Sequence, residues 1–160
     1  LNLLQYTEAM RANRRKNIRK RMTQSAALRF EFLAQIDHCD TALLDKIYAL
    51  YLQTEGRAGY VFEQLPRRYF TLTAPQSQYQ LAFWGDRLVG FIQIITQGSR
   101  STAKYIGMDY SCSSQHGLYF SLIVQMIERL RQCGLNADVR SVFAASGGRP
   151  AVDTPVMRPR

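Results

Sequence analysis

The sequence predicts a mixed α/β (α+β) domain in which helices cover a mainly antiparallel sheet. Short apolar runs at 80–84 and 87–95, separated by a Gly-Asp pair, are typical of a β-hairpin. A third strand is expected over 103–110. A helix is expected to follow over 115–133, because apolar residues recur there at helical spacing.

The residues before the hairpin are expected to add helices and one strand. Residues 1–29 are predicted to form a basic helix with a loose apolar stripe. The segment 28–35 alternates apolar and polar residues, as a strand does. A helix over 41–54 should bury one face rich in leucine, isoleucine and tyrosine, and a short helical segment should begin at Pro66.

The C-terminal end departs from this regular pattern. A last strand is expected over 139–144. Residues 146–160 then lose all periodicity and contain glycine, proline and arginine but no aromatic residue, which is typical of disorder. We therefore expect a single domain over 1–145 and a disordered or divergent tail over 146–160.

Composition excludes several classes of protein. With 160 residues, 46% of them apolar, the chain is long enough to bury a core as one domain. No apolar run is long enough to cross a bilayer, and the first residues lack the layout of a signal peptide. Three cysteines without CxxC spacing and two distant histidines favour a reduced, cytoplasmic protein without a metal site.

Most of the net charge of +9 is concentrated near the N-terminus. Residues 11–21 contain seven cations and no acid, so the rest of the chain carries only about +2. Three interpretations remain open: a solvated helix face, a disordered basic arm, or a surface that contacts RNA, an acidic cofactor or lipid headgroups. The candidate anion-binding residues are Arg14, Arg15, Arg19 and Lys20.

The order of these elements resembles the GCN5-related N-acetyltransferase (GNAT) superfamily, and local segments resemble its Fem-like acyltransferase branch. The basic opening helix of that branch is similar to Asn-Arg-Arg-Lys-Asn-Ile-Arg-Lys at 13–20. The acetyltransferase hairpin is similar to Asp-Arg-Leu-Val-Gly-Phe at 86–91. The central strand and the start of the next helix are similar to Tyr-Ile-Gly-Met-Asp-Tyr at 105–110 and Gly-Leu-Tyr at 117–119. The resemblance covers about residues 1–140.

This resemblance implies an acyltransferase that moves an acyl group from acyl-CoA, or an aminoacyl group from tRNA, to an amine of a small molecule or a cell-envelope precursor. In that fold the central strand splays from its neighbour and its free backbone groups pair with pantetheine, which here implies Ile106, Gly107 and Met108. The start of the next helix would bind the pyrophosphate, through Ser113, Ser114, Gln115, His116 and Gly117. A Gln/Arg-x-x-Gly-x-Gly/Ala loop is missing, as is expected of Fem-like members, so the donor stays open.

A second class of function also stays open. The closing strands of the fold would fall in the divergent tail, which makes an incomplete or inactive domain the alternative. Such a domain would bind RNA or an anionic membrane through residues 11–21 and catalyse nothing.

Acyl transfer to an amine needs a base for the amine and an acid for the leaving group. Asp109, at the carboxyl end of the expected third strand, is the candidate base, and capping the following helix or turn is its alternative role. Tyr110 and Tyr119 are candidate proton donors, with simple packing as the alternative for each. No Ser-His-Asp set, Walker loop or Rossmann fingerprint is present.

Overall fold

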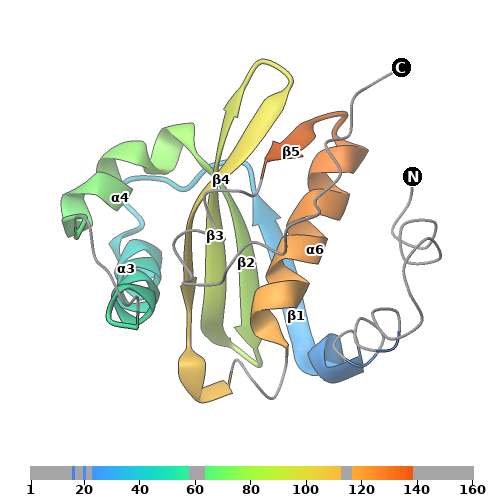
Figure 1. Cartoon of the computed structure of the whole chain (residues 1–160). Coiled ribbons are helices and arrows are strands. Elements are labelled where there is room, and N and C mark those ends of the chain that lie inside the picture. The colour runs from blue at the N-terminus through green and yellow to red at the C-terminus, as the bar shows by residue number, and fades with distance from the viewer. Residues whose placement is uncertain (1–15, 17–19, 21–22, 58–63, 113–116, 139–160) are drawn as a thin grey trace.

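A computed structural model describes residues 16, 20, 23–57, 64–112 and 117–138 (Figure 1). The five strands form one sheet in the order β1-β2-β3-β4-β5. The first four strands are antiparallel neighbours, and β5 runs parallel to β4. In chain order the elements are η1 (Ser25–Ala27), β1 (Leu28–Leu33), α3 (Thr41–Glu55), α4 (Arg67–Thr73), η2 (Ala74–Gln76), β2 (Gln78–Trp84), β3 (Arg87–Gln97), β4 (Arg100–Met108), α6 (Leu118–Gln132) and β5 (Asn136–Asp138).

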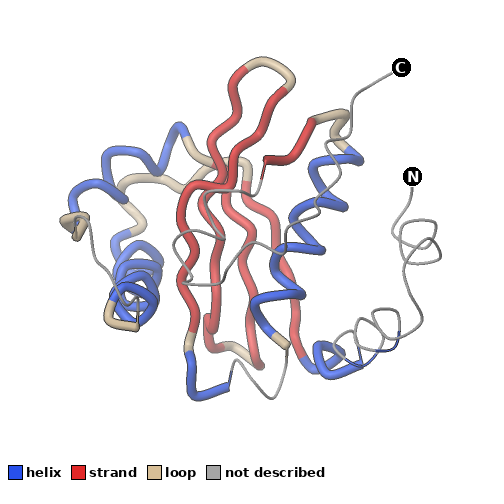
Figure 2. Tube along the Cα trace, in the orientation of Figure 1, coloured by secondary structure: helices blue, strands red, loops and turns tan. Residues whose placement is uncertain are grey.

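Helices cover both faces of this sheet. In Figure 1, α3 and α4 lie on one side of the strands and α6 lies on the other. Figure 2 shows the strands as one layer between these helices. The predicted mixed fold with a mainly antiparallel sheet is therefore confirmed. In the described part of the chain, no helix combines the length and apolar character that a membrane span requires.

One core lies between the sheet and α6. Its buried residues include Ile92, Ile94, Ile106, Leu122 and Met126. The members on α6 recur at the helical spacing that predicted this helix. The helix ends in a Schellman-type turn, in which Gly134 has a φ of +71° and Leu135 N–H donates to Leu130 O at 2.9 Å.

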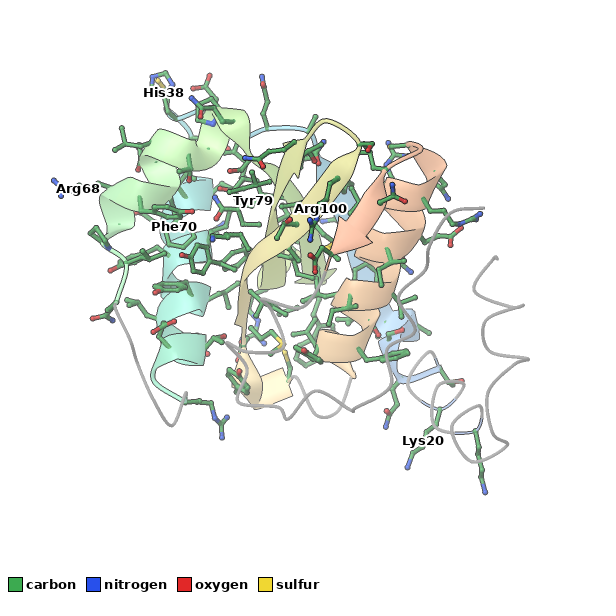
Figure 3. All side chains as sticks on the ribbon, turned by 45° about the horizontal axis from the view of Figure 1, so that its top comes forward. Lys20, His38, Arg68, Phe70, Tyr79 and Arg100 are labelled. Atoms are coloured by element: carbon green, nitrogen blue, oxygen red, sulfur yellow. The ribbon has the colours of Figure 1, made fainter. Side chains whose placement is uncertain are left out.

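A second core lies between the opposite face of the sheet and helices α3 and α4. Its largest buried side chains include Leu44, Ile47, Tyr51, Phe70, Tyr79 and Phe91. Phe70 comes from α4 and Tyr79 from β2 (Figure 3). Asp40 caps α3, because its carboxylate accepts a hydrogen bond from Leu43 N–H at 3.1 Å.

The third strand is displaced toward the N-terminus relative to the sequence prediction, because β4 begins at Arg100, three residues before the expected start. β4 ends at Met108, two residues before the expected end. Asp109 N–H still donates to Val89 O of β3 at 2.8 Å, but a helical turn begins at Tyr110. The reason is local, since the Asp109 carboxylate accepts from Ser111 N–H and bends the chain.

Element boundaries at the two ends also differ from expectation. The predicted N-terminal helix is too long, because residues 25–27 form a 3-10 turn and β1 begins at Leu28. A short parallel strand, β5, appears directly after the turn that ends α6, which the sequence did not predict. The strand expected over 139–144 and the tail over 146–160 lie outside the described residues.

Candidate functional site

In the described part of the chain, one side of β4 is paired over only part of its length. β5 pairs with β4 only through Asn136–Asp138, opposite Arg100–Thr102 at the start of β4. The side chains of Arg100 on β4 and Asp138 on β5 form an ion pair across the two strands. Figure 3 labels Arg100. Beyond it, no strand residue in the described part of the chain continues the ladder on that side. We call the second half of β4, which has no strand partner on this side among the described residues, the free edge.

A β-bulge lies where this free edge begins. Ala103 is the register partner of Ile94 on β3. The next pair joins Tyr105 to Gln93, so Lys104 has no register partner. An extra residue of this kind bends its strand and increases its twist. The bulge therefore bends β4 close to the point where its described pairing with β5 ends.

Helix α3 crosses β4 at Gly107. A Cβ atom at this position would lie 2.3 Å from Phe91 Cε1 and 2.7 Å from backbone atoms of Leu50 and Tyr51. No other residue type fits that space without a shift of the backbone. The helix thus lies directly on the strand, and its last turn reaches the free edge.

Thr54, in that last turn, binds the backbone of β4. Met108 N–H donates to Thr54 Oγ1 at 3.1 Å, and Thr54 is only 4% exposed. The side chains of Ile106 and Met108 are buried in the core beside α6. What these predicted cofactor-binding residues can offer to a ligand at the edge is therefore their backbone.

Asp109 directly follows β4 and is fully engaged. Its Oδ1 accepts from Ser111 N–H at 2.9 Å and from Ser111 Oγ–H at 2.6 Å, while Oδ2 lies 3.2 Å from Arg87 Nη1. Partial burial raises the pKa of Asp109, but the hydrogen bonds from Ser111 and the charge of Arg87 outweigh it, so this pKa lies below its ordinary value. Asp109 is therefore a carboxylate at neutral pH, and it caps a turn.

The two candidate proton donors have different surroundings. Tyr110 is half-buried beside Asp109, and the Arg57 guanidinium lies over its ring, with Cζ 4.4 Å from the ring centroid. Tyr119 lies in the first turn of α6 and packs against the core beside that helix. The structure thus brings Tyr110 and Asp109 together at the end of β4. Tyr119 belongs to a different element.

The remaining predicted residues are only partly described. Gly117, with a φ of +56°, immediately precedes α6, as a residue at the helix start should. Lys20 is helical and exposed (Figure 3). The others lie outside the described residues, and their roles stay predictions: Ser113, Ser114, Gln115, His116, Arg14, Arg15 and Arg19.

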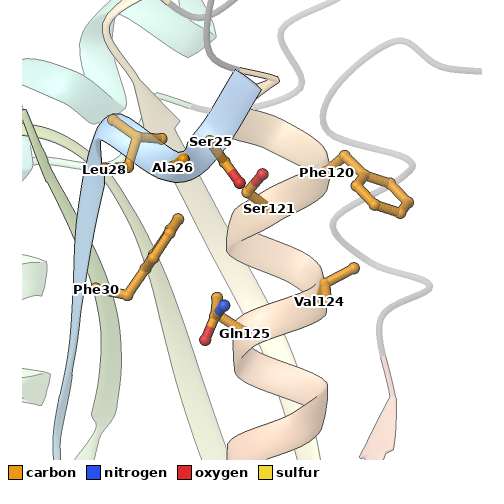
Figure 4. A pocket seen from close by; sticks show the side chains of 8 residues that line it. All are labelled: Ser25, Ala26, Leu28, Phe30, Phe120, Ser121, Val124 and Gln125. Carbon is orange, nitrogen blue, oxygen red and sulfur yellow. The ribbon is translucent and has the colours of Figure 1, made fainter. Parts of the chain in front are cut away.

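A small cavity lies between the start of β1 and the first turns of α6 (Figure 4). Its volume is about 270 Å³, and it is lined by Ser25, Ala26, Leu28, Phe30, Phe120, Ser121, Val124 and Gln125. No charged side chain is part of this lining, so the cavity lacks an electrostatic complement for a phosphate-bearing donor.

Three potential metal ligands lie on the loop before α3. Within the described residues, the ligand atoms of Asp37, His38 and Cys39 lie within 4.8 Å of one another, and all three residues are exposed. A structural zinc site needs four ligands, which this loop does not supply. We therefore build no function on it.

Comparisons with known proteins identify the fold. No family model matches this sequence, and no curated protein is similar enough to count as a relative. An aminoglycoside acetyltransferase from an uncultured soil metagenomic sample gives a TM-score of 0.55 at 14% identity, over 83% of this chain and 95% of that one. The ribosomal-protein-S18-alanine N-acetyltransferase from Escherichia coli gives 0.53 at 17% identity, over 74% and 72%. L-PGS from Bacillus licheniformis gives 0.58 at 11% identity, over 81% of this chain and 41% of that one.

The chain has the GNAT acetyltransferase fold. Identities this low show the fold alone, and they do not separate the Fem-like branch from other GNAT proteins. In this fold, Met108 at the free edge of β4 bonds to Thr54 in the last turn of α3, and Gly117 immediately precedes α6.

Sequence reasoning missed the partners of two predicted residues. Ser111 carries a local signal, since Asp-x-Ser is a common turn in which the carboxylate accepts from the backbone two residues on. Arg87 and Thr54 carry no such signal. Thr54 lies 54 positions from Met108 in the sequence, and only the packing of α3 on β4 brings them together.

Proposed function

We propose that this protein transfers an acyl group from an acyl thioester, acyl-CoA, to an amine. The observation that carries the proposal is that, among the described residues, no strand pairs with this side of β4 beyond Thr102, and Met108 N–H there donates to a side chain, Thr54 Oγ1. A free strand edge pairs with an extended, amide-bearing ligand in the way that it pairs with another strand. Pantetheine is such a ligand, and the backbone from Ile106 to Met108 would bind it.

The start of α6 supports the same proposal. The N-terminus of a helix presents unpaired N–H groups and the positive end of its dipole, which favour a phosphate. Gly117 lies at this start, and its conformation, with φ at +56°, is one that glycine adopts without strain. The pyrophosphate of the donor would bind here, next to the predicted residues 113–116.

In the proposed reaction, the amine nitrogen attacks the thioester carbon, the C–S bond breaks, and the thiolate leaves. The amine releases one proton to solvent and the thiolate takes one up from a tyrosine, which solvent then re-protonates. Tyr110 or Tyr119 would supply the latter proton. Because its pKa is lowered, Asp109 is a weak proton acceptor, and its charge is better suited to attracting a cationic amine than to deprotonating one.

Calorimetric titration with a panel of acyl-CoA chain lengths tests the proposal. We expect saturable binding whose affinity depends on the acyl chain. Aminoacyl-tRNA, the donor of some Fem-like enzymes, is titrated in parallel, because the two donors identify different branches of the fold. If neither donor binds the intact chain, the proposed enzyme function is wrong.

A binding module without catalysis is the second candidate. It is favoured by the exposed Lys16 and Lys20, which belong to the basic segment 11–21. Its partner would be RNA or an anionic membrane, and its affinity should fall steeply with salt, because bound counterions are released. Binding of acyl-CoA that depends only weakly on salt would support the enzyme. Acyl-CoA and aminoacyl-tRNA are both cytoplasmic, so the enzyme proposal places the protein there.

A further inference from the structure

The direction of one backbone amide limits how the free edge of β4 can bind a ligand. Asp109 N–H points toward β3, where it donates to Val89 O at 2.8 Å. Successive N–H groups along a strand point to opposite sides, so Met108 N–H points away from β3 and toward the free edge. This amide already donates to Thr54 Oγ1 at 3.1 Å. It has no second proton to offer to a ligand.

The Thr54 hydroxyl, by contrast, still has a proton to donate. An amide can only donate, so in the bond with Met108 the hydroxyl oxygen is the acceptor. Threonine in a helix often donates to the carbonyl four residues earlier, but in the described part of the chain Thr54 makes no such bond with Leu50 O. A buried donor without an acceptor is costly, and Thr54 is 4% exposed.

The packing around Thr54 holds this hydroxyl in place. Because Gly107 has no Cβ, the backbone of α3 can lie directly on β4. The end of the helix is further held by hydrogen bonds from Gly56 N–H to Leu52 O at 2.9 Å and from Arg57 N–H to Thr54 O at 3.1 Å. A donor fixed in this way loses little freedom when a ligand binds.

We propose that the Thr54 hydroxyl is the group that donates a hydrogen bond to the carbonyl oxygen of the acyl thioester. This inference rests on the proposed function. The Met108 amide would act through it, in a chain from N–H to hydroxyl to carbonyl in which each bond polarises the next. When the amine attacks, negative charge develops on the carbonyl oxygen and the bond from Thr54 strengthens. Thr54 keeps its proton throughout, while the C–N bond forms and the C–S bond breaks.

The test compares the binding of acyl-CoA with that of free CoA, which has no carbonyl at this position. Valine is close to threonine in shape and lacks the hydroxyl. We expect Thr54→Val to lower the affinity for acetyl-CoA about tenfold, the size of one hydrogen bond, and to leave the affinity for CoA unchanged. Thr54→Ser should keep the wild-type ratio of the two affinities.

A control variant separates this effect from loss of stability. Thr73 Oγ1, on α4, also makes a partly buried bond to Tyr69 O, at 2.8 Å, and accepts from Gln93 Nε2 at 2.9 Å, so neither bond involves β4. Thr73→Val should lower the melting temperature and keep the affinity ratio. Infrared spectra of bound acetyl-CoA give a second readout, because a carbonyl that accepts a hydrogen bond absorbs at lower frequency in the wild type and Thr54→Ser than in Thr54→Val.

The outcomes are distinct. An unchanged affinity ratio and carbonyl frequency in Thr54→Val would overturn this assignment and leave the proposed function standing. Failure of the wild type to bind acetyl-CoA would overturn both. Should Thr54→Val not fold, Thr54→Ala removes the same hydroxyl with a smaller side chain, and the same expectations apply.

Discussion

Gly107 is the residue on which the closest contact between helix and sheet depends. We expect Gly107→Ala to destabilise the protein by about 1–3 kcal/mol or more, because its Cβ would lie 2.7 Å from the backbone of α3. Urea unfolding measures this change. Gly56→Ala is the matched control: its φ is −63°, which alanine adopts freely, and the nearest atom outside its neighbours is 3.3 Å away. A smaller loss of unfolding free energy in Gly107→Ala than in Gly56→Ala would contradict the close contact between α3 and β4.

Asp109 should make stability depend on pH. A carboxyl whose pKa is lower in the folded state stabilises the protein above its unfolded pKa, about 3.9, and this stabilisation is lost as pH falls through the folded pKa. We therefore expect the melting temperature of the wild type to fall more steeply below about pH 4 than that of Asp109→Asn.

Arg87→Gln provides a graded comparison for the same measurement. It removes the nearby cation but leaves both hydrogen bonds from Ser111, which lower the pKa of Asp109 more. Its melting curve against pH should therefore lie between those of the wild type and Asp109→Asn. Identical profiles for all three proteins would show that Asp109 does not have the lowered pKa.

At the scale of single elements, the basic segment 11–21 should attract partners more than it supports folding. Replacing Arg14, Arg15, Arg19 and Lys20 together by glutamine changes helix propensity little and relieves repulsion between like charges. We expect the melting temperature to hold or rise slightly. Affinity for an anionic partner should fall, and its dependence on salt should weaken.

A charge-preserving variant controls for side-chain shape in this segment. Exchanging arginine and lysine at the same four positions keeps the charge, so the salt dependence of binding should stay close to that of the wild type. A cooperative loss of folding in the glutamine variant would mean instead that these cations pair with carboxylates of the domain.

At the scale of the whole molecule, two cores share one sheet and should unfold together. Leu122 lies in the core beside α6 and Phe70 in the core beneath α4, and both are fully buried. We expect Leu122→Ala to cost about 2–5 kcal/mol and Phe70→Ala about 3–5 kcal/mol. Because the sheet separates the two sites, the double variant should be additive within about 0.5 kcal/mol.

Two probes report on this cooperativity. Trp84 is the single tryptophan of the chain and lies at the end of β2, so its fluorescence reports the unfolding of the sheet. Circular dichroism follows the helices on both faces. Coincident urea transitions in the wild type and in each variant are expected for one cooperative unit. Separate transitions would show that one helical layer unfolds before the other.

Much of this fold was predictable because its signals are local. The hairpin of β2 and β3 follows from two apolar runs around Gly85 and Asp86, and α6 follows from the spacing of its apolar residues. Both patterns report on residues that are neighbours in the chain. The order of these elements was enough to suggest the GNAT fold, which the structural comparisons then identified.

Element ends and the candidate site were predicted less well. The turn at Asp109 was placed two residues late, because Asp-x-Ser chemistry competed with an apolar pattern that would have extended β4. β5 has only three residues, Asn136–Asp138, too few for a periodic signal. The two members of the candidate site that were placed together, Asp109 and Tyr110, are adjacent in sequence.

By itself, the sequence determined what depends on neighbours along the chain: the alternation and spacing that form strands and helices, the caps and turns that end them, and the concentration of charge at 11–21. Only the tertiary structure decided the crossing of α3 at Gly107 and the bond from Met108 N–H to Thr54. These contacts join segments about 50 residues apart, and their geometry is set by how a helix packs on a twisted, bulged sheet, which no local pattern encodes.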